Sequence, residues 1–336
     1  MSIQPSSKMG EFHGGNLDWA EEAFGRPAAG WVDLSTGINP WSYPFTPPNR
    51  EAWQRLPTYA EITALETVAA QRYGLSGQGA IVSASGSQSL IQLLPRLRER
   101  SKVAVLSPTY GEHRAAWHAA GHSVVEVEDE TGVDRDVSVV VLTNPNNPDG
   151  RIISRERLSV LRETLAARGG WLVVDEAFAD IAPDAGLADL CGSDGLIVLR
   201  SFGKFYGLAG LRLGFALTTL SLARTVVEAL GPWAVSGPAI SIACQALADD
   251  DWHLEMRSQL SMAARRLDVI LAQAGLTITG GTPLFRLVSG TDAQVIFQRL
   301  GQAGILVRHF PQYRNWLRFG IPACEEEFER LRQALS

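Results

Sequence analysis

Apolar runs alternate with amphipathic stretches through the middle of this chain. Strand-like apolar runs lie at residues 103–106, 123–127, 137–142, 171–175, 196–199 and 211–217. Apolar residues at helical spacing separate several of these runs, at 88–100, at 113–120, and from Ser154 to the stop at Gly169–Gly170. Strands alternating with amphipathic helices predict an α/β layer built around a mostly parallel sheet.

The two ends of the chain have different patterns. Residues 1–50 show little periodicity and predict an extended arm with a short strand at 31–34, and a helix is expected from Ile62 to the stop at Gly74. After Pro232 a long helix is expected at 251–274, followed by short strands at 276–279, 284–288, 305–307 and 316–319 and by helices near 292–302 and 324–335. We therefore expect an arm (1–50) that contributes to a smaller α+β domain (236–336), and a large domain at 51–235.

Composition narrows the class of protein. At 336 residues the chain is long enough for about two domains. A net charge of −6 argues against nucleic-acid binding, which needs a basic face. Three widely spaced cysteines, a start without an apolar leader, and no apolar run long enough to cross a bilayer predict a cytoplasmic protein without a membrane partner.

The strongest chemical signal surrounds Lys204. This lysine follows an apolar strand, with Ser201 three residues before it and Arg212 eight residues after it, among several glycines. A lysine amine can form an imine with an aldehyde, and a hydroxyl with a guanidinium can hold a phosphate. The pattern therefore suits a phosphate-bearing aldehyde, although this segment alone also fits a glycine-rich loop with an exposed lysine.

Two further strand ends carry polar side chains. Asn147 follows the run at 137–142, and Asp175 ends the run at 171–175. Taken singly, the first also fits a turn and the second a helix N-cap. Taken with Lys204, they fit one site at the carboxyl edge of a sheet, where a carboxylate keeps a pyridine nitrogen protonated and an amide donates to a phenolic oxygen.

These segments resemble the class I/II aminotransferase family, whose members are fold-type I enzymes that use pyridoxal 5'-phosphate (PLP). The resemblance extends over nearly the whole chain. It implies that Lys204 forms the imine, that Asp175 faces the ring nitrogen, and that Asn147 faces the phenolic oxygen. It further implies that Tyr110 has a catalytic role and stacks on the cofactor ring, and that the enzyme is a homodimer with active sites at the interface. The residues implied to contact the cofactor phosphate are Ser85, Gly86, Ser87, Ser201 and Arg212. Where the family usually has tyrosine, this chain has Phe178.

Three other segments are similar to one branch of that family. They are residues 13–16 (His-Gly-Gly-Asn), 34–40 and 232–236, and they resemble the branch that decarboxylates L-threonine O-3-phosphate to (R)-1-amino-2-propanol O-2-phosphate in cobalamin biosynthesis. The resemblance implies a small phosphorylated amino-acid substrate, with Arg318 as the site of its α-carboxylate. The expected substrate contacts are His13, Gly37, Asn147, Arg308 and Arg318. A surface position is the alternative for Arg308.

Three alternative functions can be weighed from the sequence. The same cofactor pocket serves transamination, as in histidinol-phosphate aminotransferases, and sequence does not fix which bond breaks. A PLP-sensing regulator would need a basic DNA-binding segment, and no such pattern precedes the first expected helix. His113, His118 and His122 do not share one helical face, so no metal site is expected.

Overall fold

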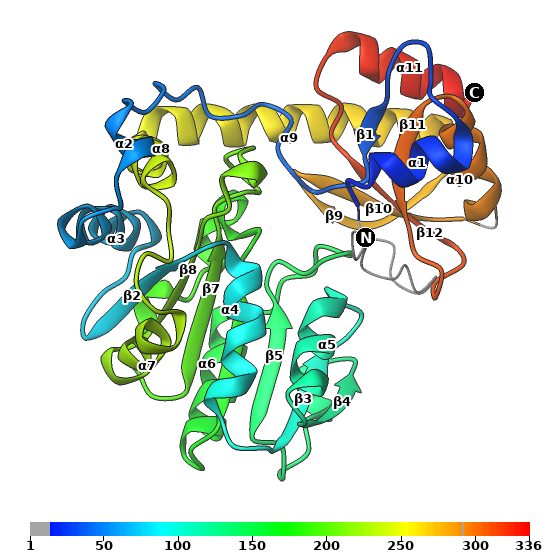
Figure 1. Ribbon diagram of the computed structural model, residues 1–336. Coiled ribbons are helices and arrows are strands. Elements are labelled where there is room, and N and C mark those ends of the chain that lie inside the picture. The colour runs from blue at the N-terminus through cyan, green and yellow to red at the C-terminus, as the bar shows by residue number, and fades with distance from the viewer. Residues whose placement is uncertain (1–13, 291) are drawn as a thin grey trace, which may run out of the picture. The chain divides into compact units, whose positions relative to one another are not determined.

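The computed structural model describes residues 14–290 and 292–336 of the chain (Figure 1). The chain folds into two compact units. Unit 2 contains residues 42–147 and 151–254. Unit 1 contains the described residues of 1–41, together with 148–150 and 255–336.

A seven-stranded sheet forms the centre of unit 2 (Figure 1). Its spatial order is β2 (Gly79–Ala84), β8 (Gly214–Thr219), β7 (Leu196–Ser201), β6 (Trp171–Asp175), β5 (Val139–Thr143), β3 (Lys102–Leu106) and β4 (Ser123–Val127). The run from β7 to β4 is parallel, whereas β8 pairs antiparallel with both β7 and β2. The middle strands are almost wholly apolar and buried, as expected of parallel strands covered on both faces.

Unit 2 also contains helices, and several of their ends carry local sequence signals. The helices are α2 (Glu51–Gln54), α3 (Tyr59–Tyr73), α4 (Ser87–Leu93), α5 (Gly111–Ala119), α6 (Arg155–Ala166), α7 (Leu220–Leu230) and α8 (Gly237–Ala248). α3 begins after Thr58, which forms a capping box with Glu61, and ends at Gly74 with a φ of +72°. Ser154 caps α6 as its sequence position predicts.

Unit 1 is a smaller α+β body. Its five-stranded sheet has the order β1 (Val32–Leu34), β11 (Ile305–His309), β12 (Trp316–Gly320), β10 (Phe285–Ser289) and β9 (Thr277–Thr282). β1 runs parallel to β11, and the other pairs are antiparallel. The helices α1 (Leu17–Phe24), α10 (Ala293–Gln302), α11 (Glu325–Leu335) and most of α9 (Asp250–Gln273) contribute to its core.

Several boundaries differ from the sequence-based expectation, among them the end of the arm in unit 1, which falls at residue 41 rather than at residue 50. The apolar helix α8 packs against α3, so the division between the units falls within α9, between residues 254 and 255, rather than at 235–236. Pro95 ends α4 early, and a 3₁₀ turn follows it where helix was expected to residue 100. Arg212 is left-handed, with a φ of +54° after a 3₁₀ turn at 209–211, so β8 begins at Gly214 instead of residue 211. Of the described helices, none has the length and hydropathy to cross a membrane.

Candidate active site

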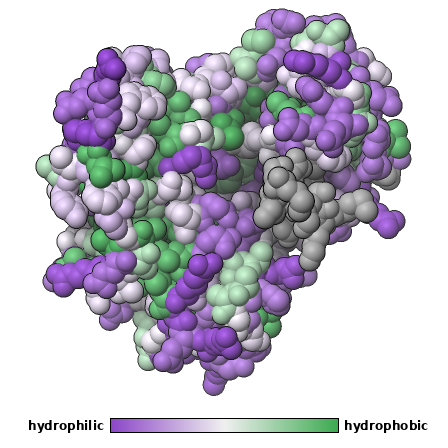
Figure 2. Space-filling model, viewed as in Figure 1, coloured by the Kyte–Doolittle hydropathy of each residue, from purple (hydrophilic) through white to green (hydrophobic). Residues whose placement is uncertain are grey.

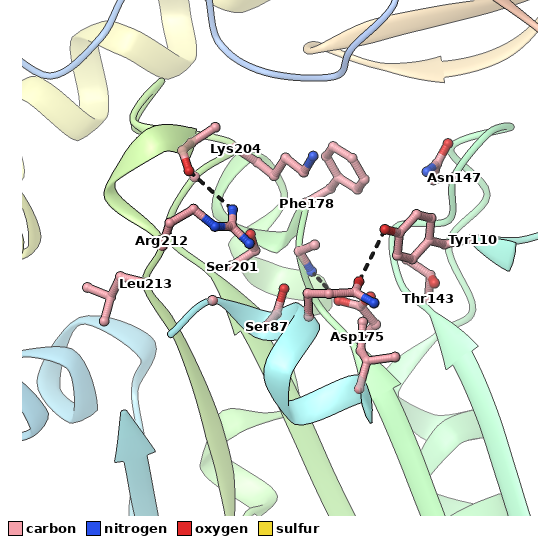
Figure 3. Close-up of a pocket in the computed structure, with 16 residues that line it drawn as sticks. Ser87, Tyr110, Thr143, Asn147, Asp175, Phe178, Ser201, Lys204, Arg212 and Leu213 are labelled. Carbon is pink, nitrogen blue, oxygen red and sulfur yellow. Dashed lines mark hydrogen bonds between the residues drawn. The ribbon is translucent and has the colours of Figure 1, made fainter. Parts of the chain in front are cut away.

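A pocket in unit 2 lies at the carboxyl ends of three neighbouring parallel strands (Figure 3). Thr143 ends β5, Asp175 ends β6 and Ser201 ends β7, and all three line the pocket. Ligands bind at this edge of open α/β sheets. The other lining residues are Gly86, Ser87, Gln88, Ile91, Tyr110, Asn147, Ala177, Phe178, Gly203, Lys204, Ala209, Arg212 and Leu213.

Lys204 extends into this pocket from a rigid turn after β7. Phe202 and Tyr206 on the two sides of Lys204 are completely buried and stack on one another, with ring centroids 4.1 Å apart. The backbone carbonyl of Tyr206 accepts a hydrogen bond from Tyr43 N, which ties the turn to a distant segment. The Lys204 Nζ lies 5.9 Å from the centre of the Phe178 ring (Figure 3). Its amine is therefore held at one end of the pocket by packing of the turn.

One side of the pocket collects groups that bind an anion. Ser87, Ser201 and Arg212 lie together in Figure 3, and Ser87 opens α4, whose N-terminal N–H groups favour negative charge. Gly86 allows this approach, because a Cβ there would lie 2.9 Å from the Arg212 Nη2. Gly214 has a similar role, since a Cβ there would lie 2.3 Å from the Ser87 backbone nitrogen. Ser85 is exposed and lies outside this lining, because it sits in the bend between β2 and α4.

A buried carboxylate lies at the base of the pocket. Asp175 is 3% exposed, and its Oδ1 accepts a hydrogen bond from the Ala177 backbone nitrogen at 3.1 Å. Its Oδ2 lies 2.9 Å from the Nε2 of His113, a residue of α5 that is 1% exposed. Among the described residues that line the pocket, Asp175 is the one carboxylate. The spacing of the histidines raised His113 only as a metal ligand, and its contact with Asp175 could not be read from that spacing.

We predict that His113→Asn lowers turnover without unfolding the protein. The imidazole fixes the orientation of the Asp175 carboxylate, and a charge-assisted hydrogen bond contributes about 1.5–3 kcal/mol. The expected loss in kcat is therefore about 10- to 100-fold. Steady-state kinetics beside a thermal unfolding curve checks this prediction. A variant with wild-type kcat would show that the carboxylate keeps its position without His113.

The remaining predicted residues border the pocket on another side. Tyr110 precedes α5, and its hydroxyl donates to Gln88 Oε1 at 3.2 Å. Asn147 lines the pocket beside Tyr110 and Thr143 (Figure 3). Phe178 is 3% exposed and offers a ring face without a hydroxyl. All of the predicted cofactor residues except Ser85 thus share one pocket.

A buried ion cluster, which no sequence pattern indicated, supports two of the strand ends. The Arg200 guanidinium pairs with Glu176 at 2.9 Å and with Asp180 at 2.7 Å, and all three residues are at most 5% exposed. Arg200 directly precedes Ser201, and Glu176 directly follows Asp175. The cluster therefore links the ends of β6 and β7 that carry pocket residues.

Unit 1 brings together two of the predicted substrate residues. Arg308 and Arg318 lie opposite one another on the antiparallel strands β11 and β12. The buried Arg318 donates from Nη2 to the Ser35 carbonyl at 2.8 Å, and Gly37 follows two residues after Ser35. His13 lies outside the described residues.

The Arg318 guanidinium is buried next to a second positive charge. Desolvation, together with the neighbouring Arg308 charge, lowers the pKa of Arg318 to about 9, and Asp33 opposes this shift. Burial and the Arg308 charge also lower the pKa of His309. Two adjacent guanidinium groups, one of them buried, form a site where a bound anion would relieve repulsion.

The fold and the pocket define an α/β enzyme of fold-type I, with a lysine, a buried carboxylate and an anion site at the carboxyl edge of one sheet. The family model of aminotransferase class I and II matches residues 49–335, and the chain belongs to this family.

Individual relatives are similar over nearly the whole length. The chain is 43% identical over 326 residues to a threonine-phosphate decarboxylase of Pseudomonas aeruginosa, with 96% of each chain covered. It is 40% identical to another threonine-phosphate decarboxylase, from Sinorhizobium sp, over 96% of this chain and 97% of the relative. A histidinol-phosphate aminotransferase of Vibrio vulnificus is 29% identical, over 86% and 88%. A solved histidinol-phosphate aminotransferase from Clostridium acetobutylicum shares the fold, with a TM-score of 0.78 at 22% identity over 90% of this chain and 97% of that one.

Proposed function

We propose that this protein is a PLP-dependent enzyme that decarboxylates L-threonine O-3-phosphate to (R)-1-amino-2-propanol O-2-phosphate. The observation that carries the proposal is the 43% identity to a threonine-phosphate decarboxylase over 96% of both chains. Histidinol-phosphate aminotransferases match at 29% over a shorter span, so transamination is the less favoured function. A role in cobalamin biosynthesis belongs to the same proposal.

The pocket of unit 2 fits the cofactor. Ser87, Ser201 and Arg212 supply donors for its phosphate, and the glycines at 86 and 214 leave the close backbone approaches that such a group needs. Lys204 would hold its aldehyde carbon, Asp175 its ring nitrogen and Asn147 its phenolic oxygen. Tyr110 would lie against its ring. When bound, PLP supplies an electron-accepting ring that lets a bond at the substrate Cα break.

The chain's own residues would then direct the reaction. Asp175, held by His113 and the Ala177 N–H, would keep a negative charge beside the ring nitrogen. The Lys204 amine would be the group that holds the cofactor before substrate arrives. After CO2 leaves, the Lys204 Nζ would return a proton to the substrate Cα, where the carboxylate had been. Arg318 would bind the α-carboxylate before that bond breaks.

The substrate carries two anionic groups, and unit 1 carries two neighbouring arginines. We assign Arg318 to the α-carboxylate, and Arg308 together with His13 to the substrate phosphate. Gly37 and Asn147 complete the proposed contacts. The support for an anion beside these two arginines is the lowered pKa of the buried Arg318 next to Arg308, which an anion would oppose.

Arg308→Ala tests the assignment of the substrate phosphate. We expect kcat/KM for threonine phosphate to fall about 10- to 100-fold, because a charge-assisted hydrogen bond contributes about 1.5–3 kcal/mol. We expect the reaction with plain threonine to be slow, because that substrate lacks the phosphate, and to change little in this variant. The two substrates are assayed side by side by CO2 release, and Arg314→Ala in the same unit serves as the control for loss of a positive charge. An equal loss on both substrates would move the phosphate site away from Arg308.

We also propose that the enzyme is a homodimer with active sites at the interface. Apolar residues gather over β2 and α7 on the face shown in Figure 2. The groove there includes the exposed residues Tyr59, Val227 and Trp233, and Tyr59 is 81% exposed. Exposed apolar patches of this kind mark association surfaces, and light scattering would give the mass of the assembly.

A further inference from the structure

A chain of three polar side chains, which no part of the proposed mechanism uses, leads from the pocket to the first turn of α5. Gln88 lines the pocket, and its Oε1 accepts a hydrogen bond from the Tyr110 hydroxyl at 3.2 Å. This bond is the dashed line that starts at the hydroxyl of Tyr110 in Figure 3. The Gln88 Nε2 donates to Glu112 Oε2 at 2.9 Å. Gln92, one turn further along α4, donates to the same Glu112 oxygen at 3.3 Å.

The chemistry of these groups fixes the direction of each bond. An ionised carboxylate can only accept, so Glu112 binds the NH2 end of the Gln88 amide. The carbonyl end of that amide must then face Tyr110, whose hydroxyl donates to it. Glu112 lies in the first turn of α5, where a negative charge interacts favourably with the helix dipole. The Glu112 carboxylate at the far end of the network therefore determines which atom donates and which accepts in each of these hydrogen bonds.

The Tyr110 ring is thereby held at two places. Its hydroxyl is bound by Gln88, and the ring forms a T-shaped contact with the His113 imidazole, with centroids 6.0 Å apart at an interplanar angle of 87°. The same imidazole bonds Asp175. A hydroxyl hydrogen bond restricts the tilt of a ring that otherwise swings about its χ angles.

We propose that Gln88 is a positioning residue that acts through Tyr110 and sets the tilt of the ring that borders the cofactor pocket. The inference rests on the proposed function for the identity of the cofactor, and on the hydrogen bonds above for the role of Gln88. Glu112 is the anchor that orients the amide. A tilted ring would stack less well on the cofactor. Loss of Gln88 should therefore weaken PLP binding while the fold stays intact.

The test compares Gln88→Leu, Tyr110→Phe and the double variant. The readouts are the dissociation constant of PLP, from titration of the apoprotein, and the absorption maximum of the bound cofactor. A neutral hydrogen bond contributes about 0.5–1.5 kcal/mol, so each single variant should raise the dissociation constant about 2- to 12-fold. The double variant should match the single variants, because both remove one shared bond.

Two further variants test the direction of the hydrogen bonds in the network. Glu112→Gln keeps the volume and lets the Gln88 amide turn over, so it should weaken PLP binding in the same direction as Gln88→Leu. Gln92→Leu removes the other donor to Glu112 without touching Tyr110, and should leave the dissociation constant within about twofold, below the range of a lost hydrogen bond. Thermal unfolding of each apoprotein reports on folding. Tyr110→Phe removes the same bond without altering α4.

The results separate this inference from the proposed reaction. Losses that multiply in the double variant, or an unchanged dissociation constant in Gln88→Leu, would overturn the role of Gln88 whatever the enzyme's product. Wild-type protein that binds PLP with the predicted pattern yet releases no CO2 from threonine phosphate would sink the proposed reaction and leave the role of Gln88 standing. Wild-type apoprotein that binds no PLP would overturn both.

Discussion

Lys204→Ala should lose the visible absorption band of the bound cofactor together with turnover. The lysine amine is the group proposed both to hold the cofactor and to return a proton to the substrate Cα. General acid–base catalysis alone contributes about 10²–10⁴-fold, so kcat should fall by at least about 100-fold. The measurements are the visible spectrum of the purified variant with added PLP and the rate of CO2 release.

The control for this variant is Lys102→Ala. Lys102 is one of three lysines in the chain and forms surface ion pairs with Asp134 and Asp136 on unit 2. Its loss should leave the spectrum and the turnover at wild-type levels. If the Lys204 variant kept the band, another amine would hold the cofactor, and the assignment made from the turn after β7 would be wrong.

Asp175→Asn should keep the fold and lose most of the turnover. Asparagine has nearly the same shape, but it removes the negative charge that the mechanism places beside the ring nitrogen. A nearby negative charge raises the pKa of a basic group such as the ring nitrogen by about 1–3 units. If turnover follows the protonation of that nitrogen, the expected loss in kcat is about 10- to 1,000-fold. The loss should exceed that of His113→Asn, because His113 acts only through the carboxylate.

Circular dichroism and steady-state kinetics together check the Asp175 variant. Asp134→Asn, an exposed change of the same type, serves as its control. Near-normal kcat in Asp175→Asn would remove the carboxylate from the mechanism. A smaller loss than in His113→Asn would mean that the imidazole acts directly rather than through Asp175.

The fold was predictable where local chemistry decides it. Strands at 123–127 and 171–175 have the expected bounds, and Gly74 and Ser154 end and start helices as their residue types predict. β2 was missed because Gly79–Ala84 is a short, partly exposed run without a clear pattern. The position of α8 depends on tertiary packing against α3, which periodicity does not contain.

The candidate site was predictable from strand ends and glycines, but not its supporting contacts. Lys204, Asp175, Asn147 and Arg212 share a pocket because parallel strands end at one edge of the sheet. The bonds of His113 to Asp175 and of Gln88 to Tyr110 join residues 62 and 22 positions apart, and no local pattern marks them. Ser85 lies outside the pocket because only its neighbours in the bend turn inward.

The proposed reaction requires that the bond between the substrate Cα and its carboxylate breaks. Decarboxylation and transamination need the same lysine, carboxylate and phosphate grip, so the pocket of unit 2 supports both, and the distinction rests on the similarity to threonine-phosphate decarboxylases.

The most direct test incubates the purified enzyme and PLP with L-threonine O-3-phosphate labelled with ¹³C at its carboxyl carbon, without any 2-oxo acid. We predict that mass spectrometry finds labelled CO2 and an unlabelled aminopropanol phosphate in equal amounts, over many turnovers. A second incubation is identical except that a 2-oxo acid is added. Label retained in a keto product in the second incubation, with no labelled CO2 in the first, would contradict decarboxylation and identify an aminotransferase.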